Sequence, residues 1–171
     1  MKMTVSVAAA IALAAGLGFV AGLAVSGRPL HAQATKMTPK EPAATSEEFR
    51  SHVIHYPDLP PVELVKGSNS RLIAGEQSMV SFLTMDAHSY FAPHHHTQEQ
   101  IMIVLDGSCD EIIEGKIYRV NKGDVVILPP NIVHGAYIGD QDVHVIDVFG
   151  EVRSDYLLKM YHTMADMNKK K

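Results

Sequence analysis

The chain has 171 residues, of which 46% are hydrophobic and 20% charged, so it can form one globular domain and is not a wholly disordered, collagenous or coiled-coil protein. Its formal net charge of −4 argues against a basic nucleic-acid-binding surface, and no nucleic-acid partner is expected. The single cysteine, Cys109, excludes an intramolecular disulfide framework and a multi-cysteine zinc site. The simplest interpretation of Cys109 is that its side chain is buried.

Residues 1–34 have the organisation of a signal peptide. Lys2 is followed by no charged residue until Arg28, and the stretch between them is rich in Ala, Val, Leu and Gly. Ala32-Gln33-Ala34 then fits the small-x-small pattern of a signal-peptidase site. The uncharged run could also span a bilayer, which needs about 20 residues, as an uncleaved anchor. In a bacterial host either outcome predicts a periplasmic or secreted domain, with membrane contact only if the segment is uncleaved.

The rest of the chain divides into a linker, one domain and a tail. Residues 35–45 are polar, contain prolines and lack periodicity, which favours a linker. Ser46 is a plausible cap for a short helix, and we expect the folded domain to span residues 46–165. Residues 166–171 end in Asn168 and three lysines and are expected to be a solvated basic tail.

The domain consists mainly of short apolar runs broken by turn signals. Asp106-Gly107 and Gly139-Asp140 are two such breaks, and Glu114-Gly115 has the spacing of a two-residue hairpin turn. The expected strands are Val62–Val65, Arg71–Ala74, Met79–Met85, Tyr90–His96, Gln100–Leu105, Asp110–Ile113, Lys116–Val120, Asp124–Leu128, Gly135–Ile138 and His144–Phe149. This pattern predicts an all-β fold with little helix, for which a double-sheet jelly-roll barrel is the economical architecture.

A histidine cluster in the middle of these strands is a candidate metal site. On a strand, His94 and His96 point to the same face while His95 points to the other. Imidazoles at this spacing can bind one metal ion. A further histidine, His134, follows the turn Pro129-Pro130-Asn131, where an antiparallel partner strand could bring it across.

The fourth candidate ligand is Gln100, which opens the next apolar run and can direct its amide oxygen to the same interior. Glu99 is the alternative fourth ligand, although successive residues on a strand point to opposite faces, so its side chain would point away from that of Gln100. Three neutral imidazoles and one amide oxygen form an uncharged ligand set suited to one divalent ion of Zn, Ni, Mn or Fe.

A second group of candidate residues lies at the C-terminal strand. Asp147 shares one face of that strand with apolar residues, and a carboxyl group is costly to bury there unless it is partnered or used. Burial would raise its pKa, which suits a general acid or base near neutral pH. Arg153 could clamp a substrate carboxylate, or the two residues could instead form a structural ion pair at the sheet edge.

These residues resemble the two motifs of the cupin superfamily. The first, Gly-x5-His-x-His-x3/4-Glu-x6-Gly, is matched by His94-x-His96-x3-Gln100-x6-Gly107, with Gln in place of Glu. The second, Gly-x5-Pro-x-Gly-x2-His-x3-Asn, is matched by Gly123-x5-Pro129-x-Asn131-x2-His134, with Asn in place of the second Gly and Ile138 in place of the final Asn. The resemblance covers about Glu63–Arg153. It implies a small jelly-roll barrel that holds one metal ion and is often a homodimer.

The segment from Asp147 to Leu157 is further similar to the ending of KdgF-type cupins. Those enzymes act on 4,5-unsaturated monouronates from pectin and alginate and help convert the ring into the linear 5-keto form, with a His, His, Gln, His metal set. The resemblance implies Asp147 as the acid/base, Phe149 as a residue shaping the sugar pocket and Arg153 as the contact of the uronate carboxylate.

Two other functions remain open on the same scaffold. One is an Fe(II)- or Mn-dependent dioxygenase or oxidase, because the ligand set alone does not exclude a redox-active metal. The other is a non-enzymatic module that binds a metal or a sugar without turnover. The expected small-molecule enzyme differs from the dioxygenase in needing no oxygen and from the binding module in turning its ligand over.

Overall fold

The computed structural model describes residues 39–169. The expected signal peptide, the first residues of the expected linker and the last two lysines lie outside the described residues. Residues 39–45 are exposed and form neither helix nor strand. Within the part of the chain that is described, no helix is long and apolar enough to cross a membrane.

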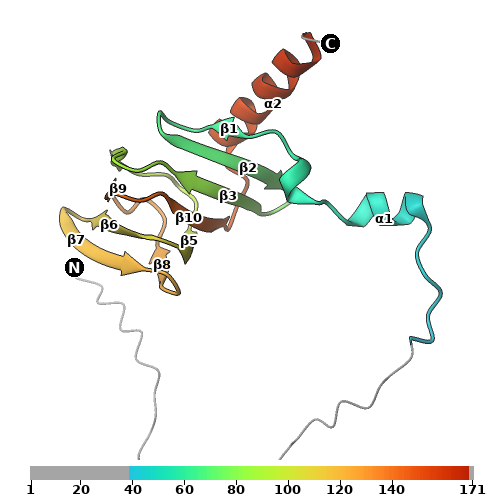
Figure 1. Cartoon of the computed structure of the whole chain (residues 1–171), viewed down its shortest axis with the longest axis horizontal. Helices are drawn as coiled ribbons and strands as arrows, with labels where there is room; N and C mark the ends of the chain where they lie inside the picture. Colours follow the sequence, from blue (N-terminus) through green and yellow to red (C-terminus); the bar gives the residue numbers. More distant parts are fainter. Residues whose placement is uncertain (1–38, 170–171) are drawn as a thin grey trace, which may run out of the picture. The chain divides into compact units, whose positions relative to one another are not determined.

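Ten strands form two antiparallel sheets within the compact unit Ala44–Lys171, which confirms the all-β jelly-roll prediction (Figure 1). The six-stranded sheet contains, in order, β1 (Val62–Glu63), β2 (Ser68–Ala74), β3 (Met79–Met85), β10 (Val143–Phe149), β5 (Gln100–Asp106) and β8 (Val125–Leu128). The four-stranded sheet contains β4 (Tyr90–His94), β9 (His134–Ile138), β6 (Ser108–Ile113) and β7 (Lys116–Asn121). Successive parts of the chain thus cross between the sheets, as a jelly roll requires.

Alternation along the strands decides which side chains enter the space between the sheets. On β10, Val145, Asp147 and Phe149 are buried while His144 is exposed, as the sequence predicts. The same alternation on β3 and β5 contributes Met79 and Val104 to one apolar core, whose burial stabilises the fold. Cys109 also lies in this core, fully buried, which confirms the interpretation made for it from the sequence.

Most strands differ from the sequence expectation at one boundary, by one to three residues, and two of these differences concern β4 and β2. Strand β4 ends at His94 and not at His96, because its partner strand β9 begins at His134, the residue that pairs with His94. Strand β2 begins at Ser68, inside residues expected to form a turn, and the reversal is made earlier by Gly67, whose φ of 81° lies in the left-handed region that favours glycine.

Helix is more abundant than the sequence predicts. The short helix α1 (Ser46–His52) is capped by Thr45, not Ser46, through a capping box with Glu48, and a 3-10 turn η1 (Tyr56–Asp58) follows. The main difference is α2 (Ser154–Lys169), which has 16 residues and continues into the expected basic tail. Its apolar side chains Tyr156, Leu157 and Met160 pack against the barrel core, and this contact with distant strands is what stabilises the helix.

Candidate metal centre and adjoining cavity

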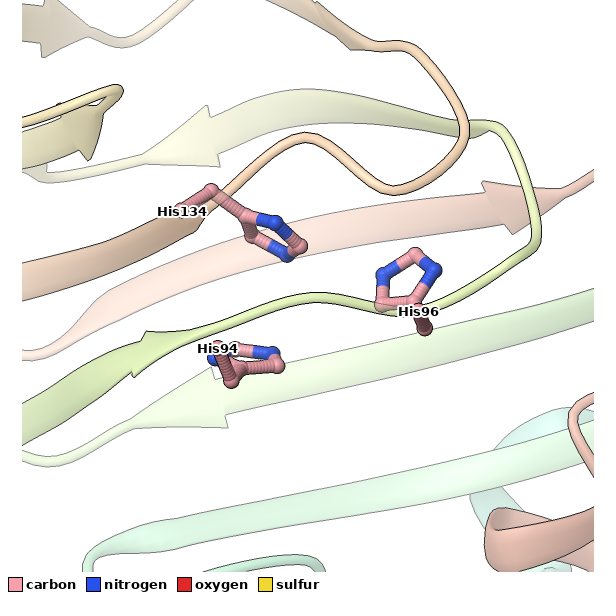
Figure 2. A group of neighbouring side chains, drawn as sticks. All are labelled: His94, His96 and His134. Atoms are coloured by element: carbon pink, nitrogen blue, oxygen red, sulfur yellow. The ribbon is translucent and has the colours of Figure 1, made fainter.

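The three predicted histidines lie together, with one nitrogen of each within 4.8 Å of the others. His94 at the end of β4 pairs directly with His134 at the start of β9, and their ring centroids are 4.4 Å apart. His96 lies in the loop after β4, and its ring centroid is 5.0 Å from that of His134. Figure 2 shows the three rings directed into one shared space.

Backbone contacts fix the loops that carry these histidines. The N–H of Asn131 donates to the carbonyl oxygen of His96 at 2.7 Å and so ties the loop after β4 to the turn before β9. Asn131 has a φ of 63°, which explains how it replaces the glycine of the cupin motif, since Asn adopts this conformation more readily than most residues.

The orientation of two histidines leaves a nitrogen available for a ligand. His94 Nδ1 lies 3.0 Å from the carbonyl oxygen of Ala92, and His134 Nδ1 lies 3.0 Å from that of Ile132. A carbonyl oxygen only accepts, so each Nδ1–H donates and each Nε2 keeps its lone pair. Metal-binding histidines are commonly oriented by such a contact of the other ring nitrogen.

Gln100, the predicted fourth ligand, lies against the cluster. It opens β5 and is buried, with its Oε1 3.1 Å from His96 Nε2. Two ligand atoms that are each about 2.1 Å from one ion are separated by roughly 3.0–3.4 Å. Glu99, the alternative ligand, is exposed and its backbone carbonyl accepts from Gly150 instead.

The electrostatics of the cluster also suit a cation. Burial lowers the pKa of His134 to about 4, and burial and then Arg153 lower the pKa of His96. Both imidazoles are therefore neutral at pH 7, which is the form that binds a metal. The residues present thus fit one divalent ion held by His94, His96, His134 and Gln100.

Asp147 lies directly behind this cluster. Gln100 Nε2 donates to Asp147 Oδ1 at 2.8 Å, so one amide side chain contacts both His96 and the carboxyl group. Burial raises the pKa of Asp147 to about 7, although the Gln100 hydrogen bond and Arg153 act in the opposite direction. A carboxyl group that titrates near neutral pH is suited to general acid/base chemistry.

Arg153 forms an ion pair, but with Asp155 and not with Asp147. Its Nε and Nη2 donate to the two carboxylate oxygens of Asp155 at 3.1 and 2.7 Å, which excludes the alternative that Asp147 and Arg153 form a structural ion pair. The guanidinium also stacks on the ring of Tyr156, 3.9 Å from its centroid. Arg153 is only 6% exposed, and its Nη1 has no hydrogen-bond partner among the described residues.

Phe149 is fully buried and lies behind the site instead of at its surface. Its ring contacts the ring of His96 edge-on at 5.7 Å and lies 5.3 Å from the guanidinium carbon of Arg153. Phe149 therefore supports the positions of these two residues and is not among those that line the adjoining cavity.

A cavity of about 580 Å³ opens next to the histidine cluster. This volume lies within the range of about 300–1,000 Å³ of small-molecule sites. Polar groups from both sheets and from α2 line it, among them His94, His134, Gln100, Asp147, Arg153 and Glu111. The cavity thus brings three of the four predicted metal ligands, the predicted acid/base and the predicted carboxylate contact into one space.

Tyr156 and Glu111 are two of the lining residues that were not predicted from the sequence. Tyr156 is the first, and it reaches the cavity only because α2 packs on the barrel. Glu111 is the second, and a signal for it existed, since Cys109 and Glu111 share one face of an apolar strand in the same way as Val145 and Asp147. The alternation of inward and outward side chains, which identified Asp147, therefore also predicts an inward position for Glu111.

The two-sheet barrel with a histidine cluster inside it defines a cupin-type domain, and comparisons agree. Residues 81–149 match the family model described as Cupin domain. This match and the fold support the resemblance to the cupin superfamily. No curated protein sequence matches the chain.

Several solved structures are similar to this chain. KdgF from Halomonas sp. is 27% identical over 57% of this chain and 90% of that chain, with a TM-score of 0.53. An RmlC-like cupin from Shewanella frigidimarina NCIMB 400 is 22% identical over 61% of this chain and 95% of that one, with a TM-score of 0.57. The polyketide cyclase RemF from Streptomyces resistomycificus is 17% identical over 65% and 96%, with a TM-score of 0.53. The last two matches concern the fold alone.

Proposed function

We propose that this cupin is a metal-dependent enzyme that converts a 4,5-unsaturated uronate into its linear 5-keto form. One observation carries the proposal: a buried arginine with an unpartnered Nη1 lines the same cavity as the histidine cluster and the buried carboxyl of Asp147. A small ligand with a carboxylate and several oxygens matches these groups. The similarity to KdgF from Halomonas sp. supports the choice of substrate class.

Each residue has a distinct task in this reaction. His94, His96, His134 and Gln100 would hold one divalent ion, which supplies Lewis-acid stabilisation of negative charge on substrate oxygens. Arg153 Nη1 donates to the substrate carboxylate and fixes the ring in the cavity. Asp147, held by Gln100, removes a proton from the substrate, and Phe149 keeps the rings of His96 and Arg153 in place.

The test is loss of the unsaturated chromophore from 4,5-unsaturated galacturonate, followed with the metal-loaded full chain. We expect metal-dependent loss without oxygen uptake, and at least a 100-fold lower kcat for Asp147→Asn. Asp110→Asn is the matched control, because Asp110 lies on the outer face of the barrel in an exposed ion pair with Arg119. An inactive, fully metallated wild type would refute the proposal, and oxygen uptake would favour the dioxygenase.

Arg153→Met tests the carboxylate contact separately. A charge-assisted hydrogen bond is worth about 1.5–3 kcal/mol, so we expect KM to rise by roughly 10- to 100-fold. Arg119→Met is the control for loss of an exposed arginine. An unchanged KM with a folded variant would remove Arg153 from the binding site.

Export and dimerisation belong to the same proposal and need their own measurements. We propose that the chain is exported to the periplasm or secreted, which cell fractionation tests, and that it is a homodimer, which sedimentation of the purified chain tests. The exposed apolar side chains Leu105, Val125 and Ile127 on β5 and β8 are compatible with association. A monomer at micromolar concentration would contradict the second part.

A further inference from the structure

The cavity contains a second buried carboxyl group, Glu111, to which neither the resemblance nor the proposed function gives a role. Glu111 lies on β6, is 4% exposed and lines the cavity. Burial and then the neighbouring Asp147 raise its pKa to about 8, and no hydrogen bond from the described residues opposes these effects. No described residue hydrogen-bonds to this carboxyl group, and its oxygens are not among the fully enclosed unpartnered atoms, so they face the cavity, where a ligand can contact them.

Glu111 and Asp147 lie on opposite walls of the cavity. Glu111 belongs to the four-stranded sheet, where it pairs with Ala136 of β9, and Asp147 belongs to the six-stranded sheet, where it pairs with Ser81 and Met102. Stacked sheets are about 10 Å apart, so a sugar ring bound between them can meet one carboxyl on each side.

The proposed reaction needs two proton transfers at separate atoms. One proton leaves the hydroxyl oxygen on carbon 1, and another is added to carbon 4, which lies across the ring from carbon 1. A single fixed carboxyl group would have to reach both positions. Two carboxyl groups on facing walls remove this difficulty.

We propose that Glu111 is a second catalytic carboxyl group, which protonates carbon 4 of the substrate while Asp147 acts as the base at the hydroxyl on carbon 1. This inference rests on the proposed function and extends it. Glu111 is suited to the acid role because no described residue donates a hydrogen bond to its carboxyl group, whereas Asp147 accepts a hydrogen bond from Gln100 Nε2.

The steps balance as an isomerisation. Asp147 takes the proton from the hydroxyl on carbon 1, the C1=O bond forms, and the bond between carbon 1 and the ring oxygen breaks with its electron pair moving to that oxygen. The resulting enolate forms the C5=O bond while the former C4=C5 pair takes the proton of Glu111 at carbon 4. Asp147 then holds a proton and Glu111 a charge, and transfer between them restores both.

Three variants of the full chain test this role: Glu111→Gln, Glu111→Met and the matched control Glu63→Gln, whose carboxyl is exposed on β1. With 4,5-unsaturated galacturonate we expect Glu111→Gln to lower kcat at least 100-fold and to change KM less than threefold. Glu63→Gln should match the wild type. A kcat within threefold of wild type for Glu111→Gln would overturn the inference.

A stability measurement separates this inference from the proposed function. If Glu111 serves a ligand and not the fold, Glu111→Met replaces an unpartnered buried carboxyl by an apolar group and should raise Tm by several degrees. A lower Tm would mean that Glu111 has a structural role and would overturn the inference. If the wild type does not act on the uronate, the proposed function fails, and a raised Tm still supports a ligand contact at Glu111.

Discussion

Close packing of β9 against β4 at Gly135 is expected to set the geometry of the metal centre. A Cβ added at Gly135 would lie 2.4 Å from the carbonyl oxygen of Phe91 and 3.0 Å from the nitrogen of Pro93. These are backbone atoms of the irregular part of β4, immediately before His94, so no side chain can rotate away.

The size of the effect of Gly135→Ala follows from these distances. Ordinary contact begins at about 3.4 Å, so β4 and β9 must separate by about 1 Å, and this separation moves His94 away from His134. Metal-ligand distances hold to within about 0.2 Å. We therefore expect metal affinity to fall by at least 10- to 100-fold and unfolding free energy to fall by about 1–3 kcal/mol, the usual cost of overpacking.

Competition titration with a chromophoric chelator measures the affinity, and urea unfolding of the metal-free chain measures the stability. Gly139→Ala is the matched control, because Gly139 follows the same strand and an added Cβ there meets nothing within 4 Å. If Gly135→Ala binds metal as tightly as Gly139→Ala, the distance between these two strands does not set the site, and the reasoning fails.

Three further outcomes are expected. His94→Ala should abolish tight metal binding measured by titration, whereas His95→Ala, at an exposed position between two ligands, should not; equal losses would contradict the assignment. Phe149→Ala should lower the unfolding free energy by about 3–5 kcal/mol in urea, and a loss below 1 kcal/mol would show that its burial is unimportant. Glu111 has a pKa of about 8 in the folded chain against an ordinary value of 4.5, so the unfolded chain loses this proton first, and stability declines as pH rises from 4.5 through 8. This decline amounts to at most about 5 kcal/mol of unfolding free energy. Glu111→Gln should remove it from the pH dependence of Tm over this range, and an unchanged pH dependence would contradict the raised pKa.

Much of the fold and of the site follows from local alternation. The side of β10 that carries Asp147 was predictable because a strand has a period of two and its other inward residues are apolar. The grouping of His94, Gln100 and His134 was predictable for the same reason, together with the motif spacing.

The remaining features depend on contacts between distant segments. His96 was expected on a strand, but β9 begins at His134, opposite His94, so His96 lies in a loop, where the hydrogen bond from Asn131 holds it. The partner of Arg153 was not predictable, because a carboxylate two residues away on α2 competes with Asp147, and the start of that helix depends on its packing against the barrel.

The replacement of Glu by Gln in the first cupin motif has a physical reason in this structure. Gln100 places Oε1 beside His96, where it can bind the metal, and donates through Nε2 to Asp147, so its neutral amide serves as ligand and donor at once. A glutamate at this position could not donate to Asp147 when ionised, and two buried carboxylates in contact would raise the pKa of one of them further. Gln100 and Asp147 therefore belong together: the amide links the metal centre to the acid/base group, and it keeps the ligand set neutral beside a carboxyl that must change its charge.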